Sequence, residues 1–280
     1  MSISLPTYTR REIPLLGRRH RMWAIIGTGL RREIRRPGAI FAVGVGTAIT
    51  TIVSIVLVFF AQFLLAGQRL DLSFFYNPAS NGAMLFFVTL MAAIVGAGLI
   101  ADDLDSMALT LYLSRPLTAA DYLTAKAAIL AALTSMIAVL PLVITPLAAA
   151  LLGLFPWDVA LEALGIGIAL GLLFTGFFTS LALFLSSLTR RRAYAASAVF
   201  AIVFGLTVPA EILAAPGSVN NPALLYLSPW EDYLAVARAA FGVSGGPIDW
   251  APALAILLGV TIITALATWI RMRAVEVVSG

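Results

Sequence analysis

Residues 101–126 read ADDLDSMALTLYLSRPLTAADYLTAK and separate two strongly apolar stretches of the chain. Asp102, Asp103 and Asp105 follow directly on the first stretch, and we expect these charges to end its burial in a membrane. Apolar side chains then recur at spacings of three and four, which predicts one apolar stripe on a short helix over 103–113. The members of this stripe are Leu104, Met107, Ala108, Leu111 and Tyr112.

A turn and a second helix follow this short helix. Pro116 in the run Ser114-Arg115-Pro116 breaks the helix, because proline lacks a backbone donor and disfavours helix in the residue before it. Thr118 and Asp121 have the spacing of a capping box, which predicts the start of the next helix. The chain is therefore expected to leave the membrane, form a short docking helix at the aqueous surface, turn and re-enter.

The segment resembles the first cytoplasmic loop of ABC-2 type transporter permeases. Leu109, the run 113–116 (LSRP) and Lys126 match the family pattern, while Met107-Ala108 replaces its usual Gly-Thr. Asp103 and Asp105 stand where the family usually has glutamate. The resemblance implies that a separate ATPase docks here. The residues it assigns to docking are Asp103, Leu104, Asp105, Met107, Ala108, Leu111, Tyr112, Arg115 and Pro116.

The composition defines the class of protein. Of the 280 residues 61% are hydrophobic and 11% are charged, which indicates an all-α integral membrane protein rather than a soluble domain. There is no cysteine and one histidine, His20, so a metal or catalytic cluster of these residues is excluded within this chain. The single lysine, Lys126, follows alanine rather than glycine, so the chain has no phosphate-binding P-loop. We therefore expect no enzyme activity, no cofactor and no metal in this chain, and ATP with magnesium in a partner.

Residues 1–39 are interpreted as a cytoplasmic tail that contains an interfacial amphipathic helix from His20 to Arg36. Trp23, Ile26 and Leu30 fall on one face, and arginines including Arg31 and Arg35 cover the rest. Such a helix lies in the membrane surface with its arginines toward anionic headgroups. A solvated basic tail is the alternative interpretation. ABC-2 permeases have a similar helix before their first span.

Residues 40–280 are predicted to form one six-span transmembrane domain. Each apolar block is close to the roughly 20 residues that a helix needs to cross the membrane. The predicted spans are 40–66, 83–101, 127–152, 160–186, 193–214 and 252–270.

The basic residues predict the orientation of these spans. With the N-terminus in the cytoplasm, sixteen of the eighteen arginines and lysines lie on the inner side, and only Arg69 and Arg238 lie outside. The protein is therefore expected to be a multi-pass protein of the cytoplasmic membrane with both termini inside. The net charge of +4 comes from these membrane-edge arginines and is no sign of nucleic-acid binding.

Three features inside the spans have more than one interpretation. Glu211, near the outer end of the fifth block, is either an interfacial glutamate or part of a transport path. Gly167 and Gly171 allow a close helix approach, either within the chain or at a dimer seam. Pro141 and Pro146 are expected to kink the third span.

The long outer loop over 215–251 is predicted to contain a short helix. Ser228, Pro229 and Trp230 have the pattern of a helix start, with proline in the first position and acidic residues after it. Trp230 and Tyr233 are expected at the outer headgroups. The Leu227-Ser228-Pro229 run is similar to an element of ABC-2 permeases, and the resemblance assigns Ser228, Pro229 and Trp230 to an outer gate.

These features favour a permease subunit that couples ATP hydrolysis by a separate ATPase to substrate movement, with export as the expected direction. By resemblance, a second permease copy or a paralogue would pair with it among the membrane lipids. An ion-coupled secondary transporter or channel is one alternative, although the sequence has no mid-membrane charge. An intramembrane lipid-modifying enzyme is another, because Asp102, Asp103 and Asp105 could bind Mg²⁺ with phosphates.

Overall fold

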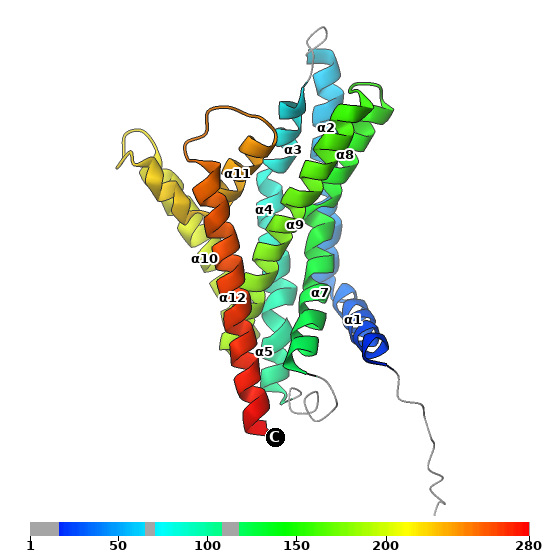
Figure 1. Ribbon diagram of the computed structural model, residues 1–280, viewed down its shortest axis with the longest axis vertical. Helices are drawn as coiled ribbons and strands as arrows, with labels where there is room; N and C mark the ends of the chain where they lie inside the picture. The colour runs from blue at the N-terminus through cyan, green and yellow to red at the C-terminus, as the bar shows by residue number, and fades with distance from the viewer. Residues whose placement is uncertain (1–16, 65–70, 108–117, 280) are drawn as a thin grey trace, which may run out of the picture.

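The computed structural model describes residues 17–64, 71–107 and 118–279. All regular elements in these ranges are helices, which confirms the predicted all-α fold (Figure 1). Six helices or helix pairs in the described part are long and apolar enough to cross a membrane, as predicted. They cover Pro37–Phe60, Gly82–Asp105, Ala119–Leu151, Trp157–Leu188, Arg192–Ala214 and Trp250–Ala274.

The first helix, α1 (Arg18–Ile34), lies beside the lower end of the bundle in Figure 1 and leads into α2 (Pro37–Leu64). The break between them falls directly before Pro37, as predicted, since proline fits the first turn of a helix but not its interior. Gly29 allows α1 to approach the next layer closely. A Cβ atom at this position would clash with the δ1 carbon of Ile129.

The second span is the most buried of the six and runs through the middle of the bundle. It consists of α4 (Gly82–Met91), one π-helical turn over Ala92–Gly96 (η2) and α5 (Ala97–Asp105). Single π turns within α-helices are rare and are frequent at functional sites. This turn could not be predicted from hydropathy, because its residues are as apolar as their neighbours.

The third span is divided into α7 (Ala119–Ala138) and α8 (Leu140–Leu151). The division falls at Val139, two residues before Pro141, as the proline predicts. The fourth span, α9 (Trp157–Leu188), packs closely against α8. A Cβ atom at Gly167 would lie 2.8 Å from the backbone oxygen of Leu142, so this glycine serves packing within the chain.

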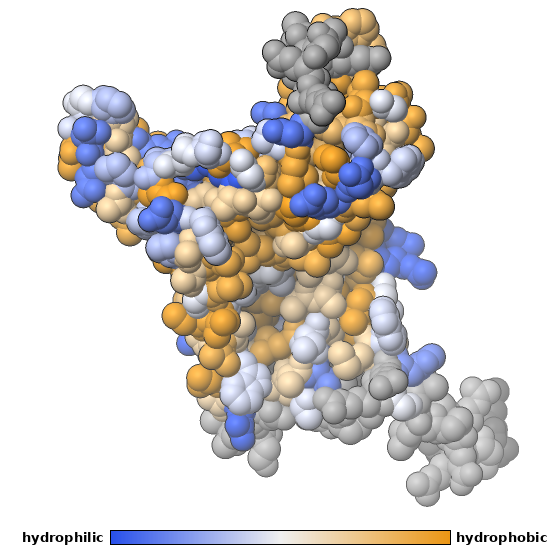
Figure 2. Space-filling view, turned by 45° about the horizontal axis from the view of Figure 1, so that its top comes forward, coloured by the Kyte–Doolittle hydropathy of each residue, from blue (hydrophilic) through white to orange (hydrophobic). Residues whose placement is uncertain are grey.

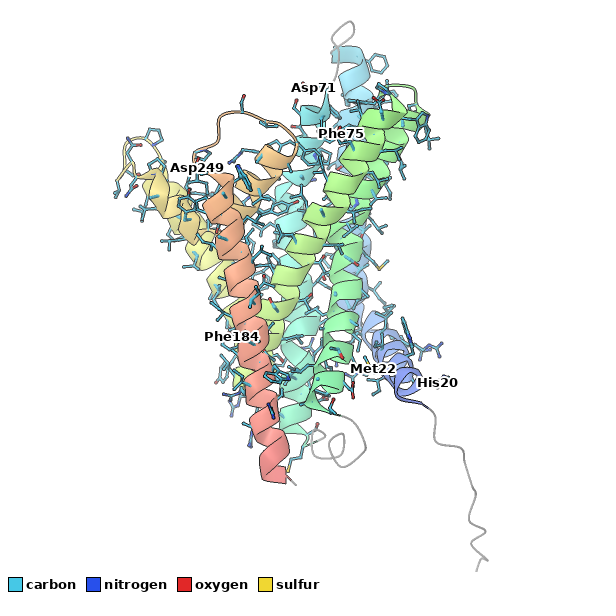
Figure 3. The ribbon with its side chains drawn as sticks, in the orientation of Figure 1. His20, Met22, Asp71, Phe75, Phe184 and Asp249 are labelled. Carbon is cyan, nitrogen blue, oxygen red and sulfur yellow. The ribbon has the colours of Figure 1, made fainter. Side chains whose placement is uncertain are left out.

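The last two spans are α10 (Arg192–Ala214) and α12 (Trp250–Ser279). Short helices lie at the end of the bundle opposite the C-terminus: η1 (Leu72–Phe75), α3 (Tyr76–Ala79), η3 (Pro222–Leu227) and α11 (Pro229–Ala240). Figure 3 places Asp71 and Asp249 at this end, which we name the far end. His20 and Met22 on α1 lie toward the opposite end, which we name the terminal end.

Apolar residues cover the middle of the face seen in Figure 2, and hydrophilic residues gather toward its ends. Large apolar side chains of α2, α10 and α12 are exposed, including Phe59, Ile212 and Ile263. A contiguous apolar surface of this kind is expected where helices meet lipid or other membrane helices. The chain is thus a multi-pass membrane protein, with a buried core around α4, α5, α7 and α9.

Candidate functional site at the terminal end of the helix bundle

Three side chains from α5 and α7 form a buried ionic contact where these two helices flank the predicted docking segment. The Nζ atom of Lys126 lies 2.6 Å from Oδ2 of Asp103. The hydroxyl of Tyr122 donates a hydrogen bond of 2.7 Å to the same oxygen. Asp103 is 6% exposed and Lys126 is 5% exposed. Burying two charges is costly, and only pairing together with further hydrogen bonds compensates for it, as found here.

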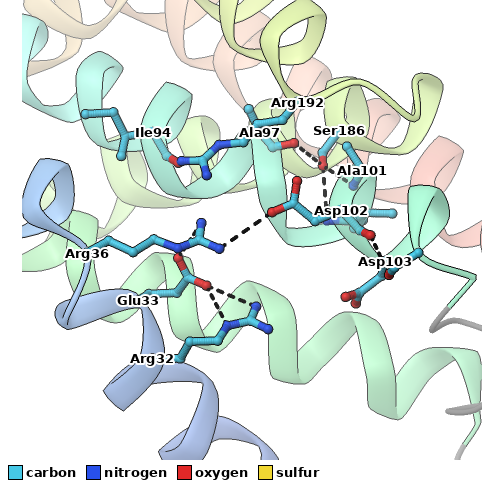
Figure 4. Close-up of polar contacts among 12 residues, drawn as sticks. Arg32, Glu33, Arg36, Ile94, Ala97, Ala101, Asp102, Asp103, Ser186 and Arg192 are labelled. Atoms are coloured by element: carbon cyan, nitrogen blue, oxygen red, sulfur yellow. Dashed lines mark hydrogen bonds and ion pairs between the residues drawn. The ribbon is translucent and has the colours of Figure 1, made fainter.

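A second group of charges attaches α1 to the same place (Figure 4). Glu33, in the last turn of α1, is 1% exposed and pairs with Arg32 at 3.0 Å and with Arg36 at 2.9 Å. Arg36 also lies 3.6 Å from Oδ2 of Asp102. The chain of contacts from Arg32 to Asp102 therefore joins α1 to the end of the second span.

Side chains from α9 and α10 hold the backbone of the second span beside these charges. The backbone N–H groups of Ile100 and Ala101 donate to Oγ of Ser186 at 3.1 and 2.9 Å, and the Ser186 hydroxyl donates to the carbonyl of Ala97 at 2.7 Å. The guanidinium of Arg192 donates to the carbonyl of Ile94, inside the π turn. Arg192 on α10 thus binds the π turn itself, and Ser186 on α9 binds the first turns of α5 directly after it.

We name the set Arg32, Glu33, Arg36, Asp102, Asp103, Tyr122 and Lys126 the ionic cluster. Asp102 and Asp103 contact different cations, Arg36 and Lys126 respectively. Within the described ranges no group of three or more acidic, histidine or cysteine side chains is placed to hold a metal ion. The two aspartates therefore have separate partners among the described residues.

The first two members of the predicted docking stripe are not on one helix, because Leu104 lies in α5 and Met107 lies beyond its end. Leu104 and Asp105 belong to the end of α5, and the helix ends there because Met107 has a left-handed backbone with φ of 54°. Asp103 faces the core rather than the surface, because Lys126 and Tyr122 bind its carboxylate. Asp105 and Met107 are exposed, as a docking surface requires. The other predicted docking residues, Ala108, Leu111, Tyr112, Arg115 and Pro116, lie outside the described residues.

The second helix of this region begins as predicted. Thr118 accepts a hydrogen bond from the backbone N–H of Asp121, and the Asp121 carboxylate accepts one from the backbone N–H of Thr118. This capping box starts α7 at Ala119, eight residues before the predicted apolar block. The docking segment is therefore bounded by a helix end at Asp105 and a capped helix start at Thr118.

The helix predicted to lie at the membrane surface corresponds to α1, and its apolar stripe divides between two environments. Ile26 and Leu30 pack against the core, whereas Trp23 is 72% exposed. Arg31 and Arg35 are exposed on the remaining faces. Trp23 is thus free to enter a membrane surface, which stays a prediction.

The predicted outer gate lies at the start of α11. Pro229 is the first residue of α11, and Ser228 is its N-cap, accepting from the backbone N–H of Glu231 at 3.1 Å. The Ser228 hydroxyl also donates to Oγ1 of Thr207 on α10 at 3.1 Å. The placement of Trp230 and Tyr233 at the headgroups was wrong. Both are buried, and their rings stack with centroids 5.5 Å apart.

The transport-path candidate Glu211 is exposed on α10 near its end, so its role stays a prediction. Sequence reasoning missed Glu33, Tyr122 and Ser186. Glu33 stands among four arginines in the run RREIRR, and one acid in a basic face is a signal for a local ion pair. Ser186 gave no signal, because its partners are backbone atoms of a distant helix.

Comparison with known protein families matches residues 50–274 to the family described as ABC-2 family transporter protein. A search of the curated proteins found no match for this chain. The match covers five of the six spans completely, together with the α5–α7 region. The chain therefore belongs to the ABC-2 transporter family, and it is the membrane-spanning permease of an ABC transporter.

Proposed function

We propose that this permease is driven by a separate ATPase that docks on the segment between α5 and α7. The observation that carries the proposal is the ionic cluster, which buries Asp103 on one side of that segment and Lys126 on the other, with 2.6 Å between their charged atoms. Closely packed protein interiors deform little and transmit strain. A push on the segment would therefore displace α5 and α7 together with the attached α1.

The orientation follows from the placement of the basic residues. We infer that the terminal end faces the cytoplasm, because the arginines of α1 and the group 190–192 lie there together with Arg271 and Arg273. Arg271 donates to the backbone oxygen of Ser187 at 2.7 Å, which fixes the end of α9 beside α12. Both termini would then be cytoplasmic and the protein would reside in the cytoplasmic membrane, where a soluble ATPase would have access to the docking segment.

The division of chemistry between the subunits follows from the sequence. This chain has no Gly-Lys-Ser/Thr motif, so ATP and magnesium would bind in the ATPase, and the permease would be no enzyme itself. Its contribution is mechanical. An ATPase transmits work only if its two nucleotide states bind the docking segment with different affinity. The exposed Asp105 and Met107 are the described residues that would meet it.

A second permease, identical or paralogous, would complete the pathway. The support is the exposed apolar surface of α2 and α10, which suits contact with the helices of a second permease as well as with lipid. Export is the proposed direction, on the family resemblance of the loop.

At the far end α11 lies between α10 and α12 and is joined to α10 through Ser228 and Thr207, which suits a gate that moves with the spans.

Purification of the intact assembly tests this proposal. The tagged full-length chain would be crosslinked in native membranes, solubilised and purified, and its partners would be identified by mass spectrometry. We expect a nucleotide-hydrolysing subunit whose crosslinks map to residues 105–118. An assembly without an ATPase, or with crosslinks only to far-end residues such as Asp249, would overturn the proposal.

A further inference from the structure

One buried carboxyl group at the far end takes no part in the coupling described above. Asp232, in the first turn of α11, is 1% exposed, and its Oδ1 atom has no hydrogen-bond partner among the described residues. Buried carboxyl oxygens are nearly always hydrogen-bonded, so an orphaned one calls for an explanation. The missing partner also distinguishes Asp232 from its neighbour Glu231, whose carboxylate pairs with Arg238 at 3.4 Å.

Asp232 lines a cavity of about 220 Å³. The walls come from four elements around α11, with Phe177 from α9, Leu206 from α10, Tyr226 from η3 and Ile256 from α12. Asp232 is the only charged residue among the described lining residues, and the rest of the lining is almost entirely apolar. The cavity therefore combines an apolar body with one carboxyl group, which is the composition of a small-ligand site.

The cavity is accessible from the side of the bundle. Leu206, Leu227 and Ile256 line it and are exposed, so its rim opens on the apolar outer surface of α10 and α12. A hydrophobic molecule dissolved in the membrane can reach this rim without passing through the protein. The volume lies between that of a cavity known to hold benzene, about 150 Å³, and drug-sized pockets from about 300 Å³.

No described group near the cavity provides a positively charged partner for the Asp232 carboxylate. The hydroxyl of Tyr226 accepts a hydrogen bond from the backbone N–H of Asp249 at 3.0 Å. Glu231 pairs with Arg238, and Glu211 on α10 and Asp249 before α12 are exposed acids. All nearby unpaired charges are thus negative, and a cationic ligand is the complementary partner.

We propose that this cavity binds a small hydrophobic amine, with the ammonium group on Asp232 and the apolar body between α9, α10 and α12. Burial and, to a smaller extent, the nearby charge of Glu231 raise the pKa of the Asp232 carboxyl to about 8. The empty site therefore carries a proton at neutral pH. An entering ammonium ion keeps its own protons and displaces the carboxyl proton to solvent, so binding of one amine releases close to one proton.

The test compares 4-phenylbutylamine with the neutral 4-phenylbutan-1-ol, which has nearly the same shape. Binding to the full-length permease in lipid nanodiscs is measured by calorimetry near pH 7, in two buffers of different ionisation enthalpy, with empty nanodiscs as the blank. We expect the amine to bind at least about tenfold more tightly than the alcohol, as charge-assisted hydrogen bonds allow, with release of close to one proton.

Two variants and one matched control separate the charge from the shape. Asp232→Asn should abolish the amine preference and the proton release while the alcohol still binds. Val260→Phe fills the cavity and should remove binding of both compounds. Asp249→Asn removes an exposed acid at the same end and should change nothing.

Equal affinity of amine and alcohol for the native protein, or amine binding that survives in Asp232→Asn, would overturn the proposal and leave a water molecule as the partner of this carboxyl. The experiment contains no ATPase and no nucleotide. Its failure would therefore leave the proposed coupling function untouched, and failure of the coupling function would leave the amine site standing.

Discussion

Lys126 Nζ and Asp103 Oδ2 lie 2.6 Å apart inside the protein, although the two residues are on different helices and lie on either side of the docking segment in the chain. This contact fixes the separation of α5 and α7 at the point where they enter and leave that segment. The hydroxyl of Tyr122 adds a third member, so the carboxylate is held from two positions on α7.

Removing one charge of this pair should destabilise the protein strongly. Lys126→Met leaves Asp103 buried without its cation, and a broken buried pair costs about 3–5 kcal/mol of the free energy of unfolding. Asp103→Leu combined with Lys126→Met should restore much of that loss, because the uncompensated charge is then gone. Unfolding of the detergent-purified variants measures both effects. A single variant as stable as the native protein would contradict the buried pair.

Ser186→Ala should loosen the second span. The hydroxyl makes three hydrogen bonds to the backbone of α5, and leaving such buried groups unpaired costs about 1–3 kcal/mol. Ser187→Ala is the matched control, because its equally buried hydroxyl bonds only the carbonyl of Phe184 in its own helix. Hydrogen exchange of the α5 amides should rise in Ser186→Ala and stay unchanged in Ser187→Ala.

Gly167→Ala should be destabilising by about 1–3 kcal/mol, the usual cost of overpacking. The added methyl group would lie 2.8 Å from the backbone oxygen of Leu142, and backbone cannot move aside as a flexible side chain can. Gly165→Ala, two residues earlier in the same helix, meets nothing within 4 Å and should be neutral or slightly stabilising. Thermal unfolding of both variants checks the difference, and equal midpoints would refute the close α8–α9 contact.

The stability of the protein should depend on pH through Asp232. The carboxyl has a pKa of about 8 in the folded protein, against 3.8 without burial. Between these values the folded state holds a proton that the unfolded state has lost, so this group lowers the free energy of unfolding as pH rises from about 4 to about 8. Unfolding across this range should show a flatter dependence in Asp232→Asn than in the native protein and in the control Asp249→Asn. Parallel curves for all three would count against a protonated Asp232.

Leu111→Asp combined with Tyr112→Asp should abolish ATP-driven activity of the assembled transporter while the protein still inserts into the membrane. Two new charges on the predicted docking stripe would prevent apolar contact with the ATPase, since burying an unpaired charge is costly. ATP turnover of the purified assembly and the amount of inserted permease are measured together. Normal turnover in this double variant would argue against docking through this stripe.

Much of the fold was predictable because a membrane imposes simple constraints on sequence. A spanning helix must be apolar over about 20 residues and must satisfy its own backbone, so the six spans could be recognised from hydropathy alone. Local signals were equally direct. The capping box at Thr118 and Asp121, the helix start at Pro229 and the break before Pro141 each depend on residues within one turn.

The site was predictable only in part, because its contacts join residues far apart in the chain. The sequence drew attention to Asp103 and Lys126 separately and assigned Asp103 to the surface, whereas the fold pairs them. Hydropathy cannot show whether a charge at the end of a span faces water or a partner on the next helix. The same limit explains Trp230, whose ring suits a headgroup region by chemistry but is buried against Phe174 and Tyr233.

The sequence by itself determined that this is a six-span helical membrane protein of the permease class, with a charged segment between its second and third spans. Those properties depend on composition, periodicity and neighbouring residues, which are visible along the chain without knowledge of how it folds. Only the tertiary structure decided which charges are paired, that Arg192 and Ser186 bind the backbone of the second span in and after its π turn, and that Asp232 lines a cavity with one carboxyl oxygen unpaired among the described residues. Such facts depend on distances between helices, and those distances are set by how all the side chains pack together.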